Sequence, residues 1–467
     1  MKKSWGRRPS NTSIPDRVIV FCRYPVPGRT KTRLIPALGR AGAAELQRCM
    51  TEEGFSRVRR FSRERKTEVV VCFEGGDEKR MTRWLGPGGS LQRQVSGNLG
   101  TRMKAAFDQA FQDGCRRVVL HGTDVPDLET IHLEEAFAAL LECDLVLGPS
   151  VDGGYWLLGL KGPADLFSTI RWGEPSVLQE TLAKAKRASL KVHLLPVLED
   201  LDTPDQLEGF FPGGCGLPPY ISVIIPTLNE GENIEPVIRR ASCGDAEVIV
   251  VDSGSEDDTV PKAKSLGAAI FHGMRGRASQ QNLGAKAARG RVVLFLHGDT
   301  LLPDSYADHV FEALMDSRVV AGGFGFRTDA DGALMRFIEF TTLVRSRYLM
   351  LPYGDQALFM RRSVFEGAGG FPECALGEDF HLVRRLSKKG RIATAPASVI
   401  TSGRRWRERG VIRTTCINQV VVAGLLLGIR AETLARIYGK GGRRKEKQVQ
   451  GPESKVQSPV QKDRAPY

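Results

Sequence analysis

Residues 291–299 read RVVLFLHGD, an apolar run that ends in the aspartate Asp299. In the first half of the chain, residues 117–127 read RVVLHGTDVPD, and Asp124 holds the matching place. A short apolar run of this kind is typical of a buried strand. In each half, a segment of helical character that contains Asn-Leu-Gly precedes the run: GNLGTRMKAAF in the first and QNLGAKAA in the second. This ordered pair predicts two domains of similar build, each with a carboxylate after a central strand.

Further short apolar runs lie on both sides of these two strands. RVIVFC (17–22) and ISVIIP (221–226) are typical of buried strands, and the run EVIVVD ends in Asp252. Such strands alternate with longer amphipathic stretches in both halves, which is the pattern of doubly wound sheets. We therefore predict an α/β fold made of two tandem doubly wound domains.

The length of the chain agrees with two domains, because 467 residues are too many for one ordinary core. The segment FPGGCGLPP (211–219) concentrates glycine and proline and is the best candidate for a linker. From Lys440 onward the sequence is charged and has no apolar face. The predicted division is a flexible arm over 1–15, a first domain over 16–210, a Gly/Pro linker over 211–219, a second domain over 220–439 and a disordered basic tail over 440–467.

The net charge of +13 does not indicate a nucleic-acid partner. Much of the excess lies near the chain ends, and no basic stripe carries interleaved aromatic residues that could stack on bases. The nine cysteines form no CxxC pair, which favours a reducing cytoplasm. The longest apolar stretch, 416–429, is shorter than the roughly 20 residues of a membrane-spanning helix. It favours a core helix over an interfacial one, although contact with the inner face of an anionic membrane stays open.

Polar side chains follow three strands of the predicted second sheet. Glu230 follows the first strand, Asp252 ends the second, and Asp299 follows the third. Ligands of open α/β sheets bind outside the carboxyl ends of the strands. A carboxylate at the end of an apolar strand is costly to bury unless it has a partner. The sequence therefore predicts one polar, ligand-binding crevice in the second domain.

The second half resembles a known family. Its motifs occur in the family's order and cover nearly all of residues 220–438. The resemblance is to the family 2 inverting glycosyltransferases with the GT-A fold, and within them to a subfamily linked by name to arsenosugar biosynthesis. It implies an enzyme that transfers a hexosyl or pentosyl group from a nucleotide-sugar donor. The motifs are ISVIIPTLNE (221–230), VIVVDSGSEDDT (248–259), RGRASQQNLGAKAARG (275–290), LPYGDQALFMRRSVFEGAGGFPE (351–373), GEDFHLVRRL (377–386) and TSGRRWRERG (401–410).

The resemblance implies a role for each matching residue. Asp299 would bind Mg²⁺ or Mn²⁺ as the only metal carboxylate, because His297 stands where the family usually has the first acid of its metal motif. Asp379, in the Glu-Asp pair with Glu378, would be the general base for the acceptor hydroxyl. The residues expected to bind the donor are Thr227, Glu230, Asp252, Arg277 and Gln280, with Arg404, Arg405 and Trp406 as a basic-aromatic patch for diphosphate and acceptor.

The first half carries a second set of candidates. Gly28 permits close approach of a ligand to the backbone, while Lys31 and Arg33 offer cations beside a predicted helix start, a sensible cradle for phosphates. Asp152 precedes two glycines and is a further donor-binding candidate. Asp124 and Asp202 follow two strands and would make a divalent-metal pair.

Residues 17–210 resemble a second GT-A-like family, through FCRYPVPGRTKTRL (21–34) and GPSVDGGYWLLGL (148–160). Members of this family are also linked by name to arsenosugar biosynthesis and are related to small nucleotidyltransferases. The combined prediction is a fused bifunctional glycosyltransferase, whose first domain could instead be a nucleotidyltransferase that makes the activated sugar. The acceptor is a small molecule or a lipid alcohol. A non-catalytic module that binds nucleic acid or a membrane is the minority alternative.

Overall fold

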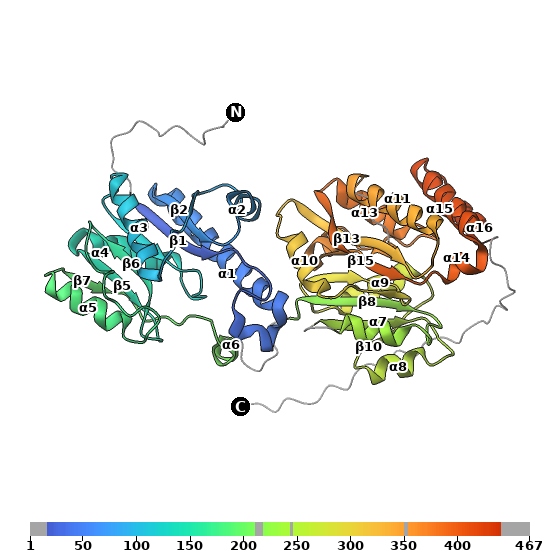
Figure 1. Cartoon of the computed structure of the whole chain (residues 1–467), viewed down its shortest axis with the longest axis horizontal. Helices are drawn as coiled ribbons and strands as arrows, with labels where there is room; N and C mark the ends of the chain where they lie inside the picture. Colours follow the sequence, from blue (N-terminus) through green and yellow to red (C-terminus); the bar gives the residue numbers. More distant parts are fainter. Residues whose placement is uncertain (1–15, 211–217, 243–245, 350–353, 440–467) are drawn as a thin grey trace, which may run out of the picture.

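The computed structural model describes residues 16–210, 218–242, 246–349 and 354–439. These residues form two α/β domains that lie side by side along the longest axis of the molecule, each built on its own sheet (Figure 1). The predicted fold class of two tandem doubly wound domains is confirmed. The expected arm 1–15, the tail 440–467 and residues 211–217 of the expected linker lie outside the described residues, and the domain bounds stay predictions.

The first domain is a sheet of seven strands in the order β3-β2-β1-β4-β6-β5-β7. The predicted strand over 17–22 is confirmed as β1, which pairs in parallel with β2 and β4. Strand β6 runs antiparallel to both of its neighbours, β4 and β5. The strands are β1 (Arg17–Arg23), β2 (Glu68–Glu74), β3 (Ser90–Arg93), β4 (Val118–His121), β5 (Leu145–Pro149), β6 (Tyr155–Leu160) and β7 (Val192–Leu194).

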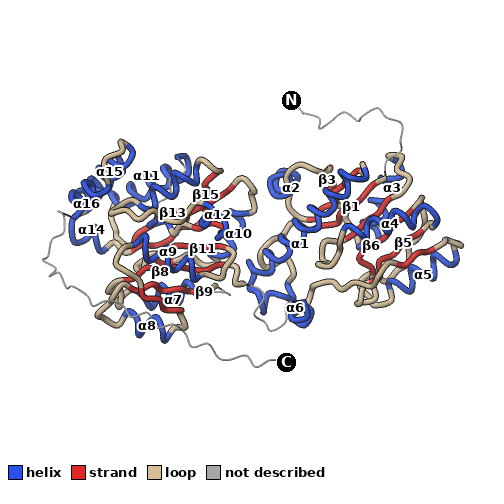
Figure 2. Tube along the Cα trace, turned by 180° about the vertical axis from the view of Figure 1, so that it is seen from behind, coloured by secondary structure: helices blue, strands red, loops and turns tan. Residues whose placement is uncertain are grey.

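Helices lie on both faces of this sheet (Figure 2). Alternate residues of β1 point to opposite faces, so Val18 and Val20 belong to one buried cluster and Ile19 to another. The helices are α1 (Ile35–Arg65), which bends at Gly39, α2 (Glu78–Leu85), α3 (Leu99–Gln112), α4 (Thr130–Glu142), α5 (Val177–Arg187) and α6 (Pro204–Phe210), with the 3-10 turn η1 (Thr32–Leu34) before α1.

The second domain is a sheet of eight strands in the order β10-β9-β8-β11-β14-β13-β15-β12. The predicted strand over 221–226 is β8, which pairs in parallel with β9 and β11. The strands are β8 (Ile221–Thr227), β9 (Glu247–Asp252), β10 (Ala269–His272), β11 (Val292–Phe295), β12 (Thr300–Leu301), β13 (Val319–Thr328), β14 (Phe359–Arg361) and β15 (Arg391–Thr401).

The helices of the second domain include α14, α15 and α16, which lie together at the end of the molecule far from the first domain (Figure 1). Within the described residues, no helix is long and apolar enough to cross a membrane. The helices are α7 (Ile234–Ala241), α8 (Thr259–Ser265), α9 (Arg277–Ala287), α10 (Tyr306–Leu314), α11 (Ala333–Leu349), α12 (Arg362–Gly367), α13 (Glu378–Ser387), α14 (Arg404–Arg409), α15 (Val411–Leu426) and α16 (Ala431–Gly439), with the 3-10 turn η2 (Gly354–Gln356).

The two RVVL runs occupy equivalent places, because β4 pairs with β1 as β11 pairs with β8, and each is followed by an antiparallel neighbour. The two Asn-Leu-Gly motifs are not equivalent. Asn98 caps the start of α3, where its side chain accepts the backbone N–H of Thr101. Asn282 lies inside α9. Its side-chain amide donates to the Phe371 carbonyl and accepts the backbone N–H of Phe371. The duplication is therefore one of architecture rather than of that motif.

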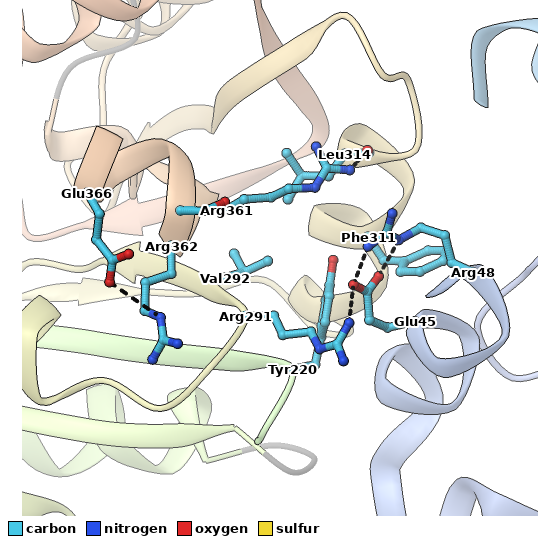
Figure 3. A pocket seen from close by; sticks show the side chains of 11 residues that line it. Glu45, Arg48, Tyr220, Arg291, Val292, Phe311, Leu314, Arg361, Arg362 and Glu366 are labelled. Carbon is cyan, nitrogen blue, oxygen red and sulfur yellow. Dashed lines mark hydrogen bonds and ion pairs between the residues drawn. The ribbon is translucent and has the colours of Figure 1, made fainter. Parts of the chain in front are cut away.

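The domains meet through α1, which packs on α10. Arg40 pairs with Asp308 at 3.0 Å, and Ser317 donates its backbone N–H to the carbonyl of Arg83. Beside this contact lies a cavity of about 300 Å³, where Glu45 faces the guanidinium groups of Arg48 and Arg291 (Figure 3). No residue predicted for function lines this cavity, so we look for the sites inside each domain.

Gly284 permits helix α9 to lie close to the sheet. A Cβ at this position would approach Ile224 Cγ2 of β8 to 2.5 Å and Val251 Cγ2 of β9 to 3.0 Å. We expect Gly284→Ala to lower the free energy of unfolding by about 1–3 kcal/mol, measured by urea denaturation, because the added methyl overpacks a close-packed core.

Gly54→Ala in helix α1 is the matched control, because a Cβ there meets no atom within 4 Å. It should raise stability by up to about 1 kcal/mol through helix propensity alone. Equal effects of the two substitutions would contradict the packing role of Gly284.

Candidate functional site

The second domain holds a cavity of about 420 Å³ beyond the carboxyl ends of its central strands. The loop after strand β11, helix α9, helix α13 and helix α14 each bring at least one predicted residue to it. The predicted residues that line it are Arg277, Asp299, Glu378, Asp379, Arg404, Arg405 and Trp406. Helices α11 and α15 close one side with Ile338, Thr342, Thr415, Asn418, Gln419, Val421, Val422 and Leu425.

Asp299 is positioned by the short pairing of β12 with β15. Ser402 donates its backbone N–H to the Asp299 carbonyl at 3.0 Å, which ties the loop after β11 to the start of α14. Gly298 is needed for this path, because a Cβ there would approach Glu230 Cγ to 3.0 Å. Asp299 therefore lies on the same cavity lining as the arginine-bearing segment that follows Ser402.

His297 lies beside Asp299 and was not among the predicted site residues. Its Nε2 is buried and has no hydrogen-bond partner among the described residues. Burial, followed by the charges of Arg277 and Arg405, holds the pKa of His297 well below its usual range. The ring is therefore a neutral imidazole with an unsatisfied buried nitrogen, and both His297 Nε2 and Asp379 Oδ2 lie 3.2 Å from the point where a Cβ on Gly354 would stand.

Asp379 and Glu378 begin helix α13, and their side chains have different environments. Asp379 accepts the backbone N–H groups of Gly354 and Phe380, both at 2.7 Å, which fixes its carboxylate beside η2. Glu378 is buried and pairs with Arg277 of α9 at 3.6 Å. Burial and then the Asp379 charge raise the pKa of Glu378, while Arg277 lowers it. The pair thus offers one ligand-accessible carboxylate and one that joins two helices.

Asp252 is 2% exposed and its hydrogen bonds stay within the protein. Its two oxygens accept bonds from the side chains of Thr227 and Ser255 and from the backbone N–H groups of Gly254 and Ser255. Burial would raise the pKa of Asp252, but these bonds bring it below its usual value. Four donors fill the acceptor positions of one carboxylate, so the immediate effect of Asp252 is to hold the turn after β9.

Gln280, like Asp252, forms hydrogen bonds at the ends of the strands. Its amide donates to the carbonyls of Thr227 at 3.0 Å and Val251 at 2.8 Å, and so joins the ends of β8 and β9. Thr227, Glu230, Asp252 and Gln280 lie behind the cavity rather than on its lining. Their roles as donor contacts stay predictions.

The predicted basic-aromatic patch belongs to helix α14. Arg404 lies 3.9 Å from Glu230, and the pKa of Glu230 is raised first by burial and also by the charge of Asp299. The Trp406 ring packs near Phe326, with 6.0 Å between ring centroids, while its indole Nε1 is buried without a partner in the described part of the chain. A ligand acceptor group could satisfy this N–H.

The cavity of the second domain fits a divalent cation that is also coordinated by oxygen atoms of a bound ligand. Asp299 offers a carboxylate and His297 Nε2 an unsatisfied nitrogen, both of which are suitable donors for Mn²⁺. Among the described residues, no group of three or more His, Cys, Asp or Glu side chains is placed to hold a metal alone. Phosphate oxygens of a bound diphosphate would have to complete the coordination.

The first domain has its own cavity of about 710 Å³ at the carboxyl ends of β1 and β4 and the amino end of the antiparallel strand β6. Lys31, Arg33, Asp124, Asp152 and Asp202 all line it, whereas Gly28 lies outside the lining and adopts a φ of 76° in the turn before it. Residues that were not predicted also line it, among them Arg102, Tyr155 and Trp172.

Lys31 lies between the two predicted metal ligands. Its ammonium is 3.0 Å from Asp124 Oδ1 and 2.8 Å from Asp202 Oδ1, and it donates to the carbonyl of Leu201 at 2.7 Å. Burial lowers the pKa of Lys31, but the two carboxylates outweigh that effect and raise it above its usual value. The predicted phosphate ligand and the predicted metal pair therefore bind one another, and the metal and phosphate roles stay predictions.

Comparison with known proteins gives separate matches for the two domains. Residues 222–370 match the model of glycosyl transferase family 2, and residues 57–174 match an uncharacterized protein family conserved in bacteria, DUF2064. The second domain thus carries a family 2 glycosyl transferase region. The resemblance to that family is confirmed over residues 222–370, whereas its extension to residue 438 and the arsenosugar subfamily stay predictions.

Two curated relatives and one solved structure illustrate the similarity. The glycosyltransferase AglE of Haloferax volcanii is 28% identical over 200 residues, which are 39% of this chain and 66% of the relative. The O-antigen chain rhamnosyltransferase RfbN of Salmonella typhimurium is 28% identical over 213 residues, which are 40% and 68%. A structure from Desulfovibrio desulfuricans G20, described as a candidate nucleotide-diphospho-sugar transferase, is 35% identical with a TM-score of 0.40 and covers 43% of this chain and 87% of its own. The chain therefore spans about two thirds of the curated relatives.

His121, which ends β4 as His297 follows β11, gives the first domain a pH-dependent stability. The ring is 1% exposed, and burial lowers its pKa to about 4 despite a hydrogen bond to the Gly122 carbonyl. The unfolded chain binds a proton near pH 6.5 but the folded chain does not, so stability is full above pH 6.5 and falls until about pH 4. The expected loss is about 3 kcal/mol.

Urea denaturation at pH 7.5 and pH 4.5 measures this effect as the difference between the native chain and His121→Gln. The substituted chain should lose less stability on acidification. An identical pH dependence in both chains would mean that His121 does not contribute.

Proposed function

We propose that the second domain transfers a sugar from a nucleotide-sugar donor to an acceptor hydroxyl, with inversion at the anomeric carbon. One observation carries the proposal: Asp299 and Asp379 face a single cavity in a domain that matches glycosyl transferase family 2. The cavity also contains Arg404 and Arg405, whose charges suit a diphosphate. Family, fold and charge arrangement therefore agree.

In this proposal Asp379 is the general base. The N–H groups of Gly354 and Phe380 hold its two oxygens in place, so the carboxylate is oriented before an acceptor arrives. It takes the proton of the acceptor hydroxyl as that oxygen attacks the anomeric carbon from the face opposite the diphosphate. Glu378 supports this geometry through its pair with Arg277, which fixes helix α13 against helix α9.

The donor would lie between the β8–β9 edge and helix α14. Thr227, Asp252 and Gln280 shape the edge where the nucleotide base is expected, and Arg404 and Arg405 approach the diphosphate. Asp299, with His297 as a second candidate ligand, would hold Mg²⁺ or Mn²⁺. When bound, the ion neutralises charge on the departing diphosphate.

The wall opposite Asp299 supports an acceptor with an apolar part, either a small molecule or a lipid alcohol. Helices α11 and α15 line the cavity with one face, and both carry large apolar side chains on their exposed surface. Phe337 and Phe340 of α11 are 62% and 63% exposed, and Val420 of α15 is 50% exposed. Arginines of α14 lie nearby, so the surface also suits peripheral contact with an anionic membrane.

For the first domain we propose a related nucleotide-sugar chemistry, which would make the chain bifunctional. Its sheet has the same strand order and its cavity lies at the same edge. A nucleotidyltransferase is the second candidate, because Arg29 and Arg33, which line the cavity, suit a triphosphate as well as a diphosphate. Release of pyrophosphate from a nucleoside triphosphate and a sugar phosphate would favour the second candidate. An arsenic-containing ribose derivative as the acceptor rests on the subfamily resemblance alone.

Asp379→Asn should lower kcat by roughly 10²–10⁴-fold, the usual contribution of a general base, while donor affinity stays unchanged. Asp299→Ala should instead weaken metal-dependent donor binding. A screen of nucleotide sugars with Mn²⁺ and Mg²⁺ identifies the donor, and calorimetry with the matching nucleoside diphosphate then separates the two effects.

Asp331→Asn is the matched control, because that carboxylate is 99% exposed and does not line the cavity. It should behave as the native chain. If the native chain neither binds nor hydrolyses any nucleotide sugar in the screen, the transferase proposal is wrong, and strongly salt-dependent nucleic-acid binding would favour the non-catalytic alternative.

The double substitution Phe337→Ser/Phe340→Ser tests the membrane contact by co-sedimentation with vesicles of anionic phospholipid. We expect the native chain to sediment and the substituted chain to lose most of that binding, because each ring contributes buried apolar area. Ile131→Ser/Leu141→Ser on α4, also exposed, is the control. Equal sedimentation of all three chains would contradict a contact through α11.

A further inference from the structure

The cleft of the first domain contains a buried positive charge that belongs to the protein. The Lys31 side chain is 2% exposed, and its ammonium has three oxygen partners: Asp124 Oδ1, Asp202 Oδ1 and the Leu201 carbonyl. An ammonium has three N–H donors. All three are therefore used within the protein, and none is left for a phosphate.

Core packing fixes this arrangement from both sides. Leu34, three residues after Lys31, packs in one buried cluster with Leu201, which directly precedes Asp202. The backbone N–H of Leu201 donates to the carbonyl of Asp124 at 3.0 Å, so the two carboxylates are held side by side. Moving the ammonium away would require a change in the turn that joins β1 to α1, or in the segment before α6.

The position of the ammonium has the features of a cation site in a sheet of this kind. Two carboxylate oxygens and one carbonyl oxygen converge on a point at the carboxyl edge of β4, and hard divalent cations prefer such oxygen ligands. A divalent ion could bind there only after displacing Lys31, since two cations at one point repel strongly. The residues present thus fit an ammonium and not an added metal.

The cavity of the second domain differs from that of the first in the cation beside its acid. Asp299 follows β11 as Asp124 follows β4, yet arginines and no lysine occur among the described residues that line the second cavity. The two domains therefore share strand order and the place of the acid, and they differ in what neutralises it.

We infer that Lys31 is the resident cation of the first domain and takes the place of a divalent metal, so that this cleft binds an anionic, phosphate-bearing ligand without metal. Arginines that line the same cavity supply positive charge for the ligand. They are Arg29 and Arg33, together with Arg23 and Arg102, which both pair with Glu74. The carboxylates of Asp152 and Asp200 line the cavity as well. Lys31 is thus a positioning residue that holds two carboxylates together and offsets one of their two negative charges, and it is not a direct phosphate contact.

Binding of Mn²⁺ alone to the full chain tests this inference, measured by the loss of the free-ion electron paramagnetic resonance signal. Asp299→Ala serves as the background, so that the second cavity does not obscure the result. We expect no Mn²⁺ site in the first domain while Lys31 is intact. Adding Lys31→Ala should open one site per chain, at least tenfold tighter than the background, and a further Asp202→Asn should abolish it.

Lys104→Ala is the matched control, because Lys104 pairs with a single carboxylate, Asp108, on the exposed face of α3. It should open no site. The inference is wrong if the Asp299→Ala chain binds one Mn²⁺ that Asp124→Asn or Asp202→Asn removes. It is equally wrong if Lys31→Ala opens no site in a chain whose circular dichroism shows that it is folded.

If Lys31→Ala does not fold, the comparison of Asp299→Ala with Asp299→Ala/Asp202→Asn decides, since Lys31 is intact in both. Equal, negligible Mn²⁺ binding supports the inference, and a site lost with Asp202 overturns it. None of these readings depends on glycosyl transfer, so failure of the proposed function would leave the result interpretable.

Discussion

The parallel pairing of β8 with β9 and β11 is the constraint on which the second domain depends. Parallel strands end at the same edge, and Thr227, Asp252 and the loop to Asp299 consequently meet there. Strand β14 pairs antiparallel with β11, and η2 directly precedes it. Because Asp379 of α13 accepts the backbone N–H of Gly354 in η2, α13 also begins at this edge. The equivalent pairing of β1 with β2 and β4 gives the first domain its cleft.

Residues at this edge divide into two groups by what their hydrogen bonds reach. Asp252 and Gln280 are buried off the cavity lining, and their hydrogen bonds hold strand ends together. Asp299, His297 and Asp379 line or border the cavity and retain atoms that a ligand can approach. A rigid support behind a small set of accessible groups is how open sheets hold reacting groups in place without mobile side chains.

The sequence predicts the fold well because buried parallel strands are short, apolar and β-branched. The runs at 17–22, 221–226 and 291–299 have these features, and they correspond to β1, β8 and β11. The sequence could predict which acids line the cavities where they follow such strands, as Asp124 and Asp299 do, while their roles stay predictions. Side-chain partners were not predictable: that Lys31 turns inward to Asp202, 171 residues away, depends on packing of Leu34 against Leu201. The repeated Asn-Leu-Gly motif correctly marked a helical segment before each central strand, but three residues cannot specify whether they start a helix or lie inside one.

The amide bridge of Gln280 has a consequence for how sequence variation in this chain would be read. Because its two N–H groups join β8 to β9, loss of that side chain would first reduce the amount of folded protein in a cell and only then affect turnover. A genetic screen that scores growth would rank such a change with loss of Asp379, although one acts through protein abundance and the other through chemistry. Quantifying the protein level in each mutant strain would therefore distinguish residues that stabilise the fold from residues that take part in the reaction.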